Sequence, residues 1–478
     1  MKKQQLNPYL PSWEYIPDAE PYVFNDRVYI YGSHDRFNGH AYCLNDYVCW
    51  SAPVDDLSDW RYEGEIFKKT GDPLNPDASM CLYAPDVTVG PDGRYYLYYV
   101  LDKLSIVSVA VSDTPAGKFE FYGYVHYADG TRLGEKEEDQ PQFDPGVINE
   151  GEKTYLYTGF CQKGDKSRNG AMATVLDSDM LTIIEEPKFV IPSEPYSEGT
   201  GFEGHEFFEA PSIRKRGDTY YLIYSSILMH KLCYATSKKP TEGFEYQGTI
   251  VSNADIGIDS YKAADKPMYY GGNNHGSIVE INNQWYIFYH RHTNGTNFSR
   301  QACLEKIEFT KQGNIPQVEM TSTGSKDNPL IGVGEYPAYL ACNLFTDEES
   351  VYTDFTGAWM DKQFPKITQD GKDGDKEAGY IQNMKDSATA GFKYFEFNNI
   401  NKVKIKVRGY CSGRFEVKTA WDGEVLAEIP VHSSNIWQEY STDIEIPDGV
   451  QSIYLTYRGE GSASLKSFTL NPKEEINE

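Results

Sequence analysis

One pattern recurs five times along the first two thirds of this 478-residue chain. Each copy has a polar residue, an apolar segment, a turn with Gly, Asp or Asn, and an aromatic segment, as in HEFFEAPSIRKRGDTYYLIYSS at residues 205–226. Repeats of about four short strands with periods of this length are typical of β-propeller blades. We therefore predict a five-bladed β-propeller. The copies begin, at spacings of 68, 58, 65 and 66 residues, at Asp18, Asp86, Asp144, Glu209 and His275.

A propeller places the equivalent residues of its blades around one axis, so these polar side chains should face a shared cavity. A single Asp before a strand is usually a turn or capping residue. Four acids at equivalent positions are different, because like charges crowded together cost folding energy and a repeat does not need them for stability. They indicate a chemical role, in which we expect Asp144 to line the cavity or support its structure.

The composition limits the kinds of molecule that the protein can bind. Aromatic residues make up 14% of the chain, with 38 Tyr and 7 Trp. They favour β structure and offer flat apolar faces for sugar rings, although most of them should pack the blades. The formal net charge is −26, and so acidic a chain repels phosphate, which argues against nucleic acid and anionic membranes as partners. A neutral substrate fits better.

Cysteine usage and hydropathy bear on location. The eight cysteines are scattered without a CxxC pair, so we expect buried free thiols instead of a zinc or redox site. The opening residues MKKQQLNPYLPSWEYIPD contain no apolar run of signal-peptide length, and no stretch approaches the length of a membrane span. We therefore expect a cytoplasmic protein.

The sequence changes character after about residue 344. A polar region rich in Gly, Asp and Lys is followed by segments of strict period-two alternation, which is typical of sheets with one polar face. We predict an all-β chain with two domains, a propeller at residues 1–340 and a β-sandwich of jelly-roll type at residues 341–478. The alternating segments are 392–397, 403–408, 415–418 and 452–457.

Glycoside hydrolysis is a reaction that needs carboxyl groups around a funnel, because one acid protonates the leaving oxygen and another attacks or activates water. Glu209 lies in the apolar run FFEAP, a setting that raises a carboxyl pKa toward that of a proton donor. Asp18, near Glu20, has a more polar setting that suits a base. Two other classes stay open: a sugar-binding propeller without catalysis, and a transferase with a similar pocket.

Three segments, in order and at blade spacing, resemble glycoside hydrolase family 43: 17–21 (PDAEP), 84–87 (APDV) and 209–212 (EAPS). The resemblance implies a five-bladed propeller and hydrolysis with inversion of anomeric configuration. It assigns Asp18 as the base that activates water and Glu209 as the acid. It also assigns Asp86 as the residue that orients Glu209 and raises its pKa. In an inverting enzyme the acid and the base lie about 6.5 to 9.5 Å apart.

The same resemblance extends to binding residues. His275, in the segment HGS, resembles an axial histidine of the family that holds a calcium ion through water, so a structural or pKa-tuning calcium is expected at the axis, without an organic cofactor. The alternative is a hydrogen-bonded core histidine. Arg300 resembles the arginine that contacts the terminal sugar, and Arg291 is a second candidate for that contact.

The C-terminal region resembles carbohydrate-binding module family 6, through residues 403–408, 436–438 and 465–468. The resemblance implies a sugar-binding domain, and a domain that only supports the propeller is the alternative. Trp421 is either a stacking platform or a core residue, and for Trp437 we favour the core.

The family's main substrates suggest an exo-acting α-L-arabinofuranosidase, with β-xylosidase activity as a second or principal alternative. Its substrates would be arabinoxylan or arabinan oligosaccharides. The long loop at residues 251–274 is of a length that is often lid-like and could block an open, endo-acting groove.

Overall fold

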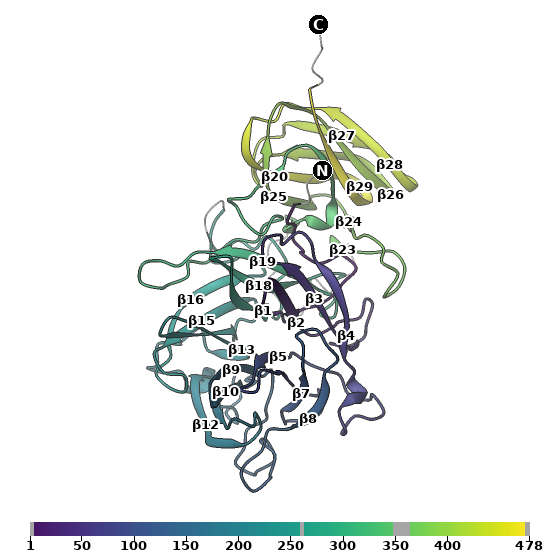
Figure 1. Ribbon diagram of the computed structural model, residues 1–478. Helices are drawn as coiled ribbons and strands as arrows, with labels where there is room; N and C mark the ends of the chain where they lie inside the picture. The colour runs from purple at the N-terminus through teal and green to yellow at the C-terminus, as the bar shows by residue number, and fades with distance from the viewer. Residues whose placement is uncertain (1–3, 259–261, 348–363, 474–478) are drawn as a thin grey trace.

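The computed structural model describes residues 4–258, 262–347 and 364–473, and it confirms an all-β chain with a five-bladed propeller (Figure 1). Within these residues no helix has the length and apolarity needed to cross a membrane. All eight cysteines are free thiols, and all except the half-buried Cys81 are buried, as expected.

Blades 1 to 4 are four-stranded antiparallel sheets, and blade 5 has three strands. In chain order the strands are β1 (Glu20–Phe24), β2 (Arg27–Tyr31), β3 (Tyr47–Pro53) and β4 (Arg61–Phe67); β5 (Asp86–Val89), β6 (Tyr95–Tyr99), β7 (Ser108–Ser112) and β8 (Glu120–Tyr124); β9 (Gly146–Glu150), β10 (Lys153–Thr158), β11 (Gly170–Leu176) and β12 (Ile183–Pro192); β13 (Phe207–Arg216), β14 (Thr219–Ser226), β15 (Lys231–Ser237) and β16 (Glu245–Ser252); β17 (Ser277–Ile281), β18 (Gln284–His292) and β19 (Arg300–Ile307).

Each blade begins with the hairpin that the repeat predicts. In blade 4, Arg216 pairs with Thr219 across a two-residue turn whose Gly217 has a φ of 61°, a left-handed conformation that such tight turns require. The first strands of neighbouring blades lie against one another around the axis. The turn before each first strand therefore opens toward the centre of the ring.

The N-terminal segment closes the ring between blades 1 and 5. The backbone N–H of Tyr9 donates to the carbonyl of Ala302 in β19 (3.2 Å), and the Asn7 side chain donates to the carbonyl of Leu304 (2.6 Å). One apolar cluster then joins Tyr9 to Val28 of blade 1 and Phe288 of blade 5. Closure therefore depends on residues that precede the first blade.

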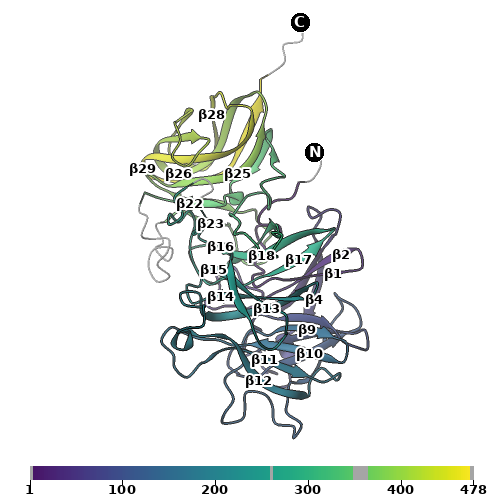
Figure 2. The same ribbon diagram turned by 90° about the vertical axis from the view of Figure 1, so that its left-hand side faces the viewer.

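The second domain is one curled, ten-stranded sheet (Figure 2). Its centre is the long strand β29, which pairs with β26 along one side and with β25, β24 and β21 in turn along the other. The strands are β20 (Leu330–Ile331), β21 (Gly334–Pro337), β22 (Asn343–Phe345), β23 (Lys366–Thr368), β24 (Tyr380–Met384), β25 (Thr389–Phe397), β26 (Ile400–Lys418), β27 (Ala427–Val431), β28 (Ser434–Asp443) and β29 (Gly449–Pro472).

The second sheet begins before the boundary expected at residue 340. β20 pairs with β25, and β21 pairs with β29, so both strands belong to the second domain. Strands of two and four residues are too short to show a period-two pattern, which explains why the sequence did not reveal them.

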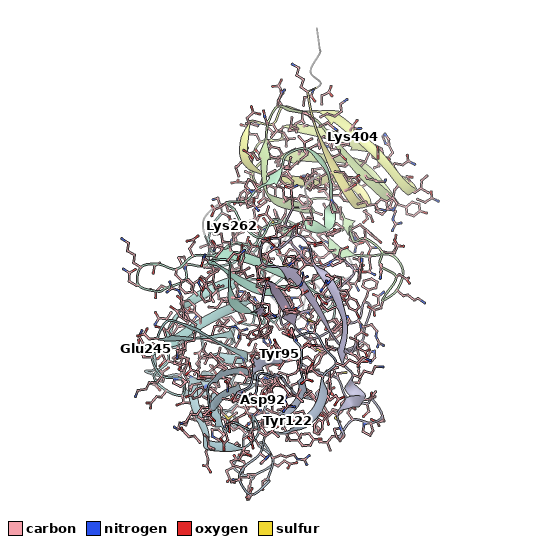
Figure 3. All side chains as sticks on the ribbon, in the orientation of Figure 1. Asp92, Tyr95, Tyr122, Glu245, Lys262 and Lys404 are labelled. Carbon is pink, nitrogen blue, oxygen red and sulfur yellow. The ribbon has the colours of Figure 1, made fainter. Side chains whose placement is uncertain are left out.

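The two domains share a continuous core. One apolar cluster runs from Ile250 and Tyr269 near blades 4 and 5 to Leu344, Phe392 and Phe468 of the second sheet. Side chains fill the junction between the two domains, near the label of Lys262 (Figure 3). The long loop after β16 contributes to this contact, since its Met268, Tyr269 and Tyr270 are buried. Residues 259–261 of that loop lie outside the described residues.

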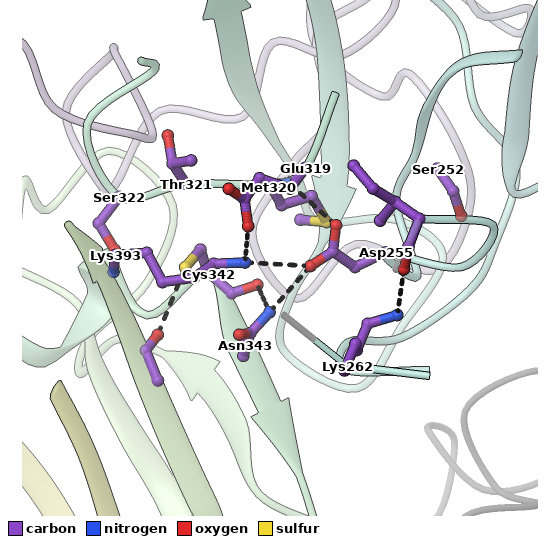
Figure 4. A network of polar contacts seen from close by, with 12 residues as sticks. Ser252, Asp255, Lys262, Glu319, Met320, Thr321, Ser322, Cys342, Asn343 and Lys393 are labelled. Atoms are coloured by element: carbon purple, nitrogen blue, oxygen red, sulfur yellow. Dashed lines mark hydrogen bonds and ion pairs between the residues drawn. The ribbon is translucent and has the colours of Figure 1, made fainter. Parts of the chain in front are cut away.

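A buried ionic network crosses the same junction (Figure 4). Lys393 of β25, 1% exposed in its side chain, lies 3.2 Å from Asp255 and 3.1 Å from Glu319. The Tyr394 hydroxyl donates to the other oxygen of Glu319 (2.7 Å), and Asn343 donates to Asp255 (3.3 Å). Charges with this many partners fix how the second domain sits on the propeller.

Lys393→Met should reduce stability by about 3 to 5 kcal/mol, because Asp255 and Glu319 would lose the buried ammonium group that contacts both of them. Denaturant unfolding followed by fluorescence measures the loss. Lys402→Met is the matched control, since the Lys402–Asp443 pair (3.7 Å) is exposed and should change stability by less than about 1 kcal/mol. Equal stability of Lys393→Met and wild type would contradict the role given to this network.

Candidate active site

A cavity of about 360 Å³ opens at the propeller axis, a volume typical of pockets for small ligands. All five blades contribute to its wall. Three carboxyl groups and two basic side chains therefore face one volume. The lining residues are Asp18, Tyr42, Cys43, Tyr83, Ala84, Phe143, Asp144, Phe160, Phe208, Glu209, Met229, Asn273, His275 and Arg300.

Tight backbone bends deliver the carboxyl groups: Asp18 and Asp144 precede the first strand of their blades, and Glu209 lies within β13 at a break in its register. Asp18 and Asp144 have φ values of 59° and 44°, and Ala210, which follows Glu209, has a φ of 63°. Positive φ is uncommon outside glycine, although Asp tolerates it, and residues of this kind gather at functional sites. The shared conformation shows that Asp18, Asp144 and Ala210 are equivalent positions of three blades.

The acid of blade 2 is two residues out of register with Asp18 and Asp144, and Glu209 of blade 4 stands one residue before the equivalent position, Ala210. Asp18, Asp144 and His275 each stand two residues before the first strand of their blade, whereas Asp86 is itself the first residue of β5. The residue of blade 2 that matches Asp18 is therefore Ala84, which lines the cavity, whereas Asp86 does not. The repeat in the sequence had been aligned on the acids, and this alignment displaced blade 2 by two residues.

Asp86 lies further along the axis, where it ties inner strands together. Its carboxylate accepts hydrogen bonds from the Tyr22 hydroxyl and from the backbone N–H groups of Val87 and Val147, at 2.7 Å each. Burial, followed by the charge of Glu20, raises the pKa of Asp86 to about 8. These contacts hold blades 1, 2 and 3 together and give Asp86 no place beside the reacting sugar.

Asp144 stands where Asp86 was expected. Its Oδ2 lies 3.8 Å from Nδ1 of His275. Burial raises the pKa of Asp144 to about 7, although the charge of His275 lowers it. Asp144 is also the carboxylate with the largest effect on Glu209. The position of Asp144 in the cavity therefore suits the role of tuning Glu209, whereas the sequence had placed Asp144 on the axis only as a lining residue.

Glu209 has the environment of a proton donor. Part of its surface faces the cavity, yet protein surrounds the carboxyl group. Burial, followed by the charges of Asp144 and Asp18, raises the pKa of Glu209 well above its ordinary value, although His275 and Arg300 oppose the shift. A carboxyl group that stays protonated near neutral pH can act as a general acid.

Asp18 is held as an acceptor. Nη1 of Arg300 donates to its Oδ1 (3.0 Å), and its backbone N–H donates to Nδ1 of His290 (3.3 Å). Burial, followed by the charge of Arg300, lowers the pKa of His290 well below the ordinary value, so this ring is neutral and can accept that bond. A carboxylate fixed in this way beside a guanidinium suits a general base.

The two arginine candidates have different places. Arg300 lines the cavity, and its guanidinium donates to both carboxylate oxygens of Asp35 (2.9 and 3.0 Å), a contact that sequence patterns did not reveal. Arg291 lies outside the cavity and donates to the carbonyls of Tyr339 (2.5 Å) and Ala341 (2.6 Å). Arg291 therefore anchors the start of the second domain, and Arg300 alone meets the sugar-binding expectation.

His275 lies between two carboxylates. Nε2 is 3.4 Å from Oε1 of Glu20, and Nδ1 faces Asp144. Burial lowers the pKa of His275, but the hydrogen bond to Glu20 and the charges of Asp18 and Asp144 outweigh burial and raise the pKa to about 9. The ring is therefore a cation at neutral pH.

Basic side chains surround Glu20, next to the expected site of the calcium ion. Nε2 of His275 and the guanidinium of Arg214 lie 3.4 and 2.7 Å from the two carboxylate oxygens of Glu20. Among the residues that the structure describes, no group of three or more His, Cys, Asp or Glu side chains could hold a metal ion.

Comparison with known proteins agrees with this geometry. The model of Glycosyl hydrolases family 43 matches residues 13–315. A protein named xylosidase/arabinosidase from Thermoclostridium stercorarium is 78% identical over 470 residues, which cover 98% of this chain and 99% of that protein. The chain belongs to glycoside hydrolase family 43. It is therefore a glycoside hydrolase, and its cavity is a family 43 site.

More distant relatives show how far the similarity reaches. A xylosidase/arabinosidase from Bacteroides ovatus is 30% identical over 65% of this chain and 97% of its own length. A β-xylosidase/α-arabinofuranosidase from a compost metagenome, solved with xylotriose, is 26% identical, with a TM-score of 0.51 over 66% of this chain and 98% of its own.

Some of the similar solved structures cover both domains. An arabinoxylan arabinofuranohydrolase from Bacillus subtilis, in complex with cellotetraose, covers 98% of this chain and 97% of its own, with a TM-score of 0.53 and 19% identity. The similarity supports the fold of the whole family 43 chain, second domain included.

An aromatic wall beside Glu209 completes the family 43 site. The rings of Phe143 and Phe160 lie 5.2 Å apart, those of Phe160 and Phe208 5.4 Å, and those of Tyr83 and Phe143 5.6 Å. Such rings shield the acid from water and offer apolar faces to a sugar. Only Phe208, next to Glu209, could have been found from the sequence, because the other rings come from separate loops.

Asp144→Asn should move the basic limb of the kcat/KM profile to lower pH. Removing a negative neighbour lowers the pKa of Glu209, so the acid loses its proton sooner as pH rises. We expect kcat at the wild-type optimum to fall about tenfold or more, because one pKa unit corresponds to a factor of ten. Rates measured across pH with an aryl glycoside substrate test this expectation.

Asp86→Asn is the matched control, and the basic limb should stay in place because Asp86 does not line the cavity. A shift with Asp86→Asn and none with Asp144→Asn would restore the original assignment.

Proposed function

We propose that this family 43 enzyme is an inverting, exo-acting hydrolase of terminal pentoses. It removes α-L-arabinofuranosyl residues, and β-D-xylosyl residues as a second activity, from the non-reducing ends of arabinoxylan or arabinan oligosaccharides. The observation that carries the proposal is a single small cavity in which Glu209 has a raised pKa while Asp18 is held by Arg300.

The reaction follows from these positions. Asp18 takes a proton from a water molecule, whose oxygen attacks the anomeric carbon from the face opposite the leaving group. Glu209 gives its proton to the glycosidic oxygen as the bond between that oxygen and the anomeric carbon breaks. The product sugar has inverted configuration, and proton exchange with solvent restores Asp18 and Glu209. Arg300 holds Asp18 and faces the sugar.

Exo action is supported by the cavity itself. All five blades close around a volume of about 360 Å³, and Met229 and Asn273 from two different loops complete the wall. A site built in this way accepts a chain end more readily than the middle of a polymer.

Two observations support a pentose as substrate. Relatives at 78% and 30% identity are both named xylosidase/arabinosidase, and the two pentoses present their hydroxyl groups in similar arrangements. A single cavity can therefore accept both. We place arabinofuranose first, and a principal β-xylosidase is the alternative.

Sugar binding by the second domain stays a prediction. The two tryptophans named for it have different surroundings. The half-buried Trp437 packs edge-to-face on Tyr380 (5.4 Å) and has the Arg408 guanidinium 4.3 Å from its ring centre. Trp421 has the Lys266 ammonium group 4.7 Å from its ring centre. Neither ring is a bare platform. The calcium ion and the cytoplasmic location also stay predictions of the sequence.

The proposed function is tested with p-nitrophenyl α-L-arabinofuranoside and β-D-xyloside, and with proton NMR of the first-formed anomer. We expect release of both pentoses with inversion. Asp18→Asn should lower kcat by at least about two orders of magnitude on every substrate. Glu209→Gln should lower kcat by as much with natural oligosaccharides. It should lower kcat far less with a dinitrophenyl glycoside, because that leaving group needs no proton.

A non-catalytic propeller would release no sugar from any of these substrates, and a transferase would form products longer than its substrate. Retention of configuration would contradict the inverting mechanism without removing the acid from Glu209.

A further inference from the structure

One turn of the second domain touches three propeller segments that supply the sugar site. The turn comprises residues 366–375, which run from β23 toward β24, and the segments are residues 15–18, 34–46 and 294–300. We propose that this turn is a positioning element of the sugar site, with Asp373 as its anchor. The inference rests on the proposed function, because it concerns how the same cavity is held in shape.

Asp373 closes the base of the loop at residues 34–46. Its Oδ1 accepts the backbone N–H of Phe37 (2.8 Å), and its Oδ2 accepts a side-chain N–H of Asn45 (3.1 Å). Asn45 also donates from the same nitrogen to the carbonyl of Asp35 (3.0 Å), and from its backbone to the carbonyl of His34 (3.0 Å). One carboxylate thus joins both ends of the loop.

This loop holds the groups that face the sugar. Asp35, fully buried, accepts the backbone N–H of Cys43 (3.1 Å) and two N–H groups of Arg300. Arg300 in turn donates to Asp18 and lies 4.9 Å from the ring centre of Tyr42. A shift of the loop would therefore move Arg300 and Tyr42, and it would loosen the base.

Other residues of the turn contact the remaining two segments. Oε1 of Gln369 accepts the hydroxyl of Tyr15 (2.8 Å), and the Tyr15 ring stacks on Phe37 with 5.8 Å between centres and 17° between planes. The hydroxyl of Thr368 donates to the side-chain oxygen of Asn294 (2.8 Å). The turn thus reaches the segments that carry Asp18 and Arg300 as well as the loop between them.

A contact that served only to dock the domains would not need this arrangement. The buried network around Lys393 and the shared core already join the domains on another part of the junction. Asp370, in the same turn, faces its own domain, where its carboxylate receives two hydrogen bonds from Arg408 (2.7 and 3.0 Å). Asp370 is therefore a matched control for Asp373.

The test compares Asp373→Ala with Asp370→Ala, using kcat and KM on p-nitrophenyl pentosides and calorimetric binding of D-xylose and L-arabinose. We expect Asp373→Ala to lower kcat/KM about tenfold or more, chiefly by raising KM, and to weaken sugar binding by a similar factor. Asp373→Asn keeps an acceptor for Phe37 and should recover most of the loss. Asp370→Ala should stay within about twofold of wild type, and scanning calorimetry should show folded variants throughout.

Asn45→Ala removes the same link from the propeller side, so it tests the inference even where Asp373→Ala does not fold. Combined with Asp373→Ala, it should lose less than the sum of the two single losses, because the two changes share the hydrogen bond between Asn45 and Asp373.

Wild-type kcat/KM in Asp373→Ala, or an equal loss in Asp370→Ala, would overturn the inference. If wild type released no pentose, the proposed substrate would fail, and the inference would be judged by sugar affinity alone.

Discussion

The placement of charge around the propeller axis is the constraint on which this enzyme depends. Three carboxyl groups share one cavity with two cations, and neighbours decide which acid keeps its proton. Arg300 is bonded to Asp18, and His275 lies between Glu20 and Asp144. Within the described part of the chain the Glu209 carboxyl group has no ion-pair partner, and burial with the charges of Asp144 and Asp18 raises its pKa well above the ordinary value. The division into base and acid follows from this difference in partners, since like charges at short range cannot all ionise.

Buried charges need fixed partners, and the fold supplies such partners in two places. Below the cavity, Arg214 and Glu20 form a buried ion pair, and Asp86 links the inner strands of three blades. Beside the cavity, the turn at residues 366–375 meets the segments that hold Asp18 and Arg300. Groups fixed before the substrate arrives need no reorganisation during the reaction, which is how electrostatic preorganisation lowers a barrier. The second domain therefore helps to hold the active site of the propeller in place.

The sequence predicted the features that repeat along the chain and those that depend only on neighbouring residues. The period of the hairpins revealed the propeller, and the apolar run around Glu209 indicated the acid. Asp86 was expected to face the cavity because an acid two residues downstream looks equivalent in sequence, whereas strand register places it outside the cavity lining. Arg291 could not be told from Arg300, since only tertiary contacts decide which of two buried arginines faces the axis. Asp35 and Asp373 lie on loops without a pattern, so only the folded chain brings Asp35 to Arg300 and Asp373 to Asn45.

Direct titration of Glu209 tests the central claim. Carbon-13 NMR of protein labelled at the glutamate carboxyl carbons, with Glu209→Gln to assign the signal, reports the pKa of this one group. Burial and the neighbouring carboxylates predict a midpoint well above that of an ordinary glutamate, and a lower midpoint in Asp144→Asn. A midpoint near the ordinary value of about 4.3 in wild type would show that the cavity does not create the acid, and the account would fail.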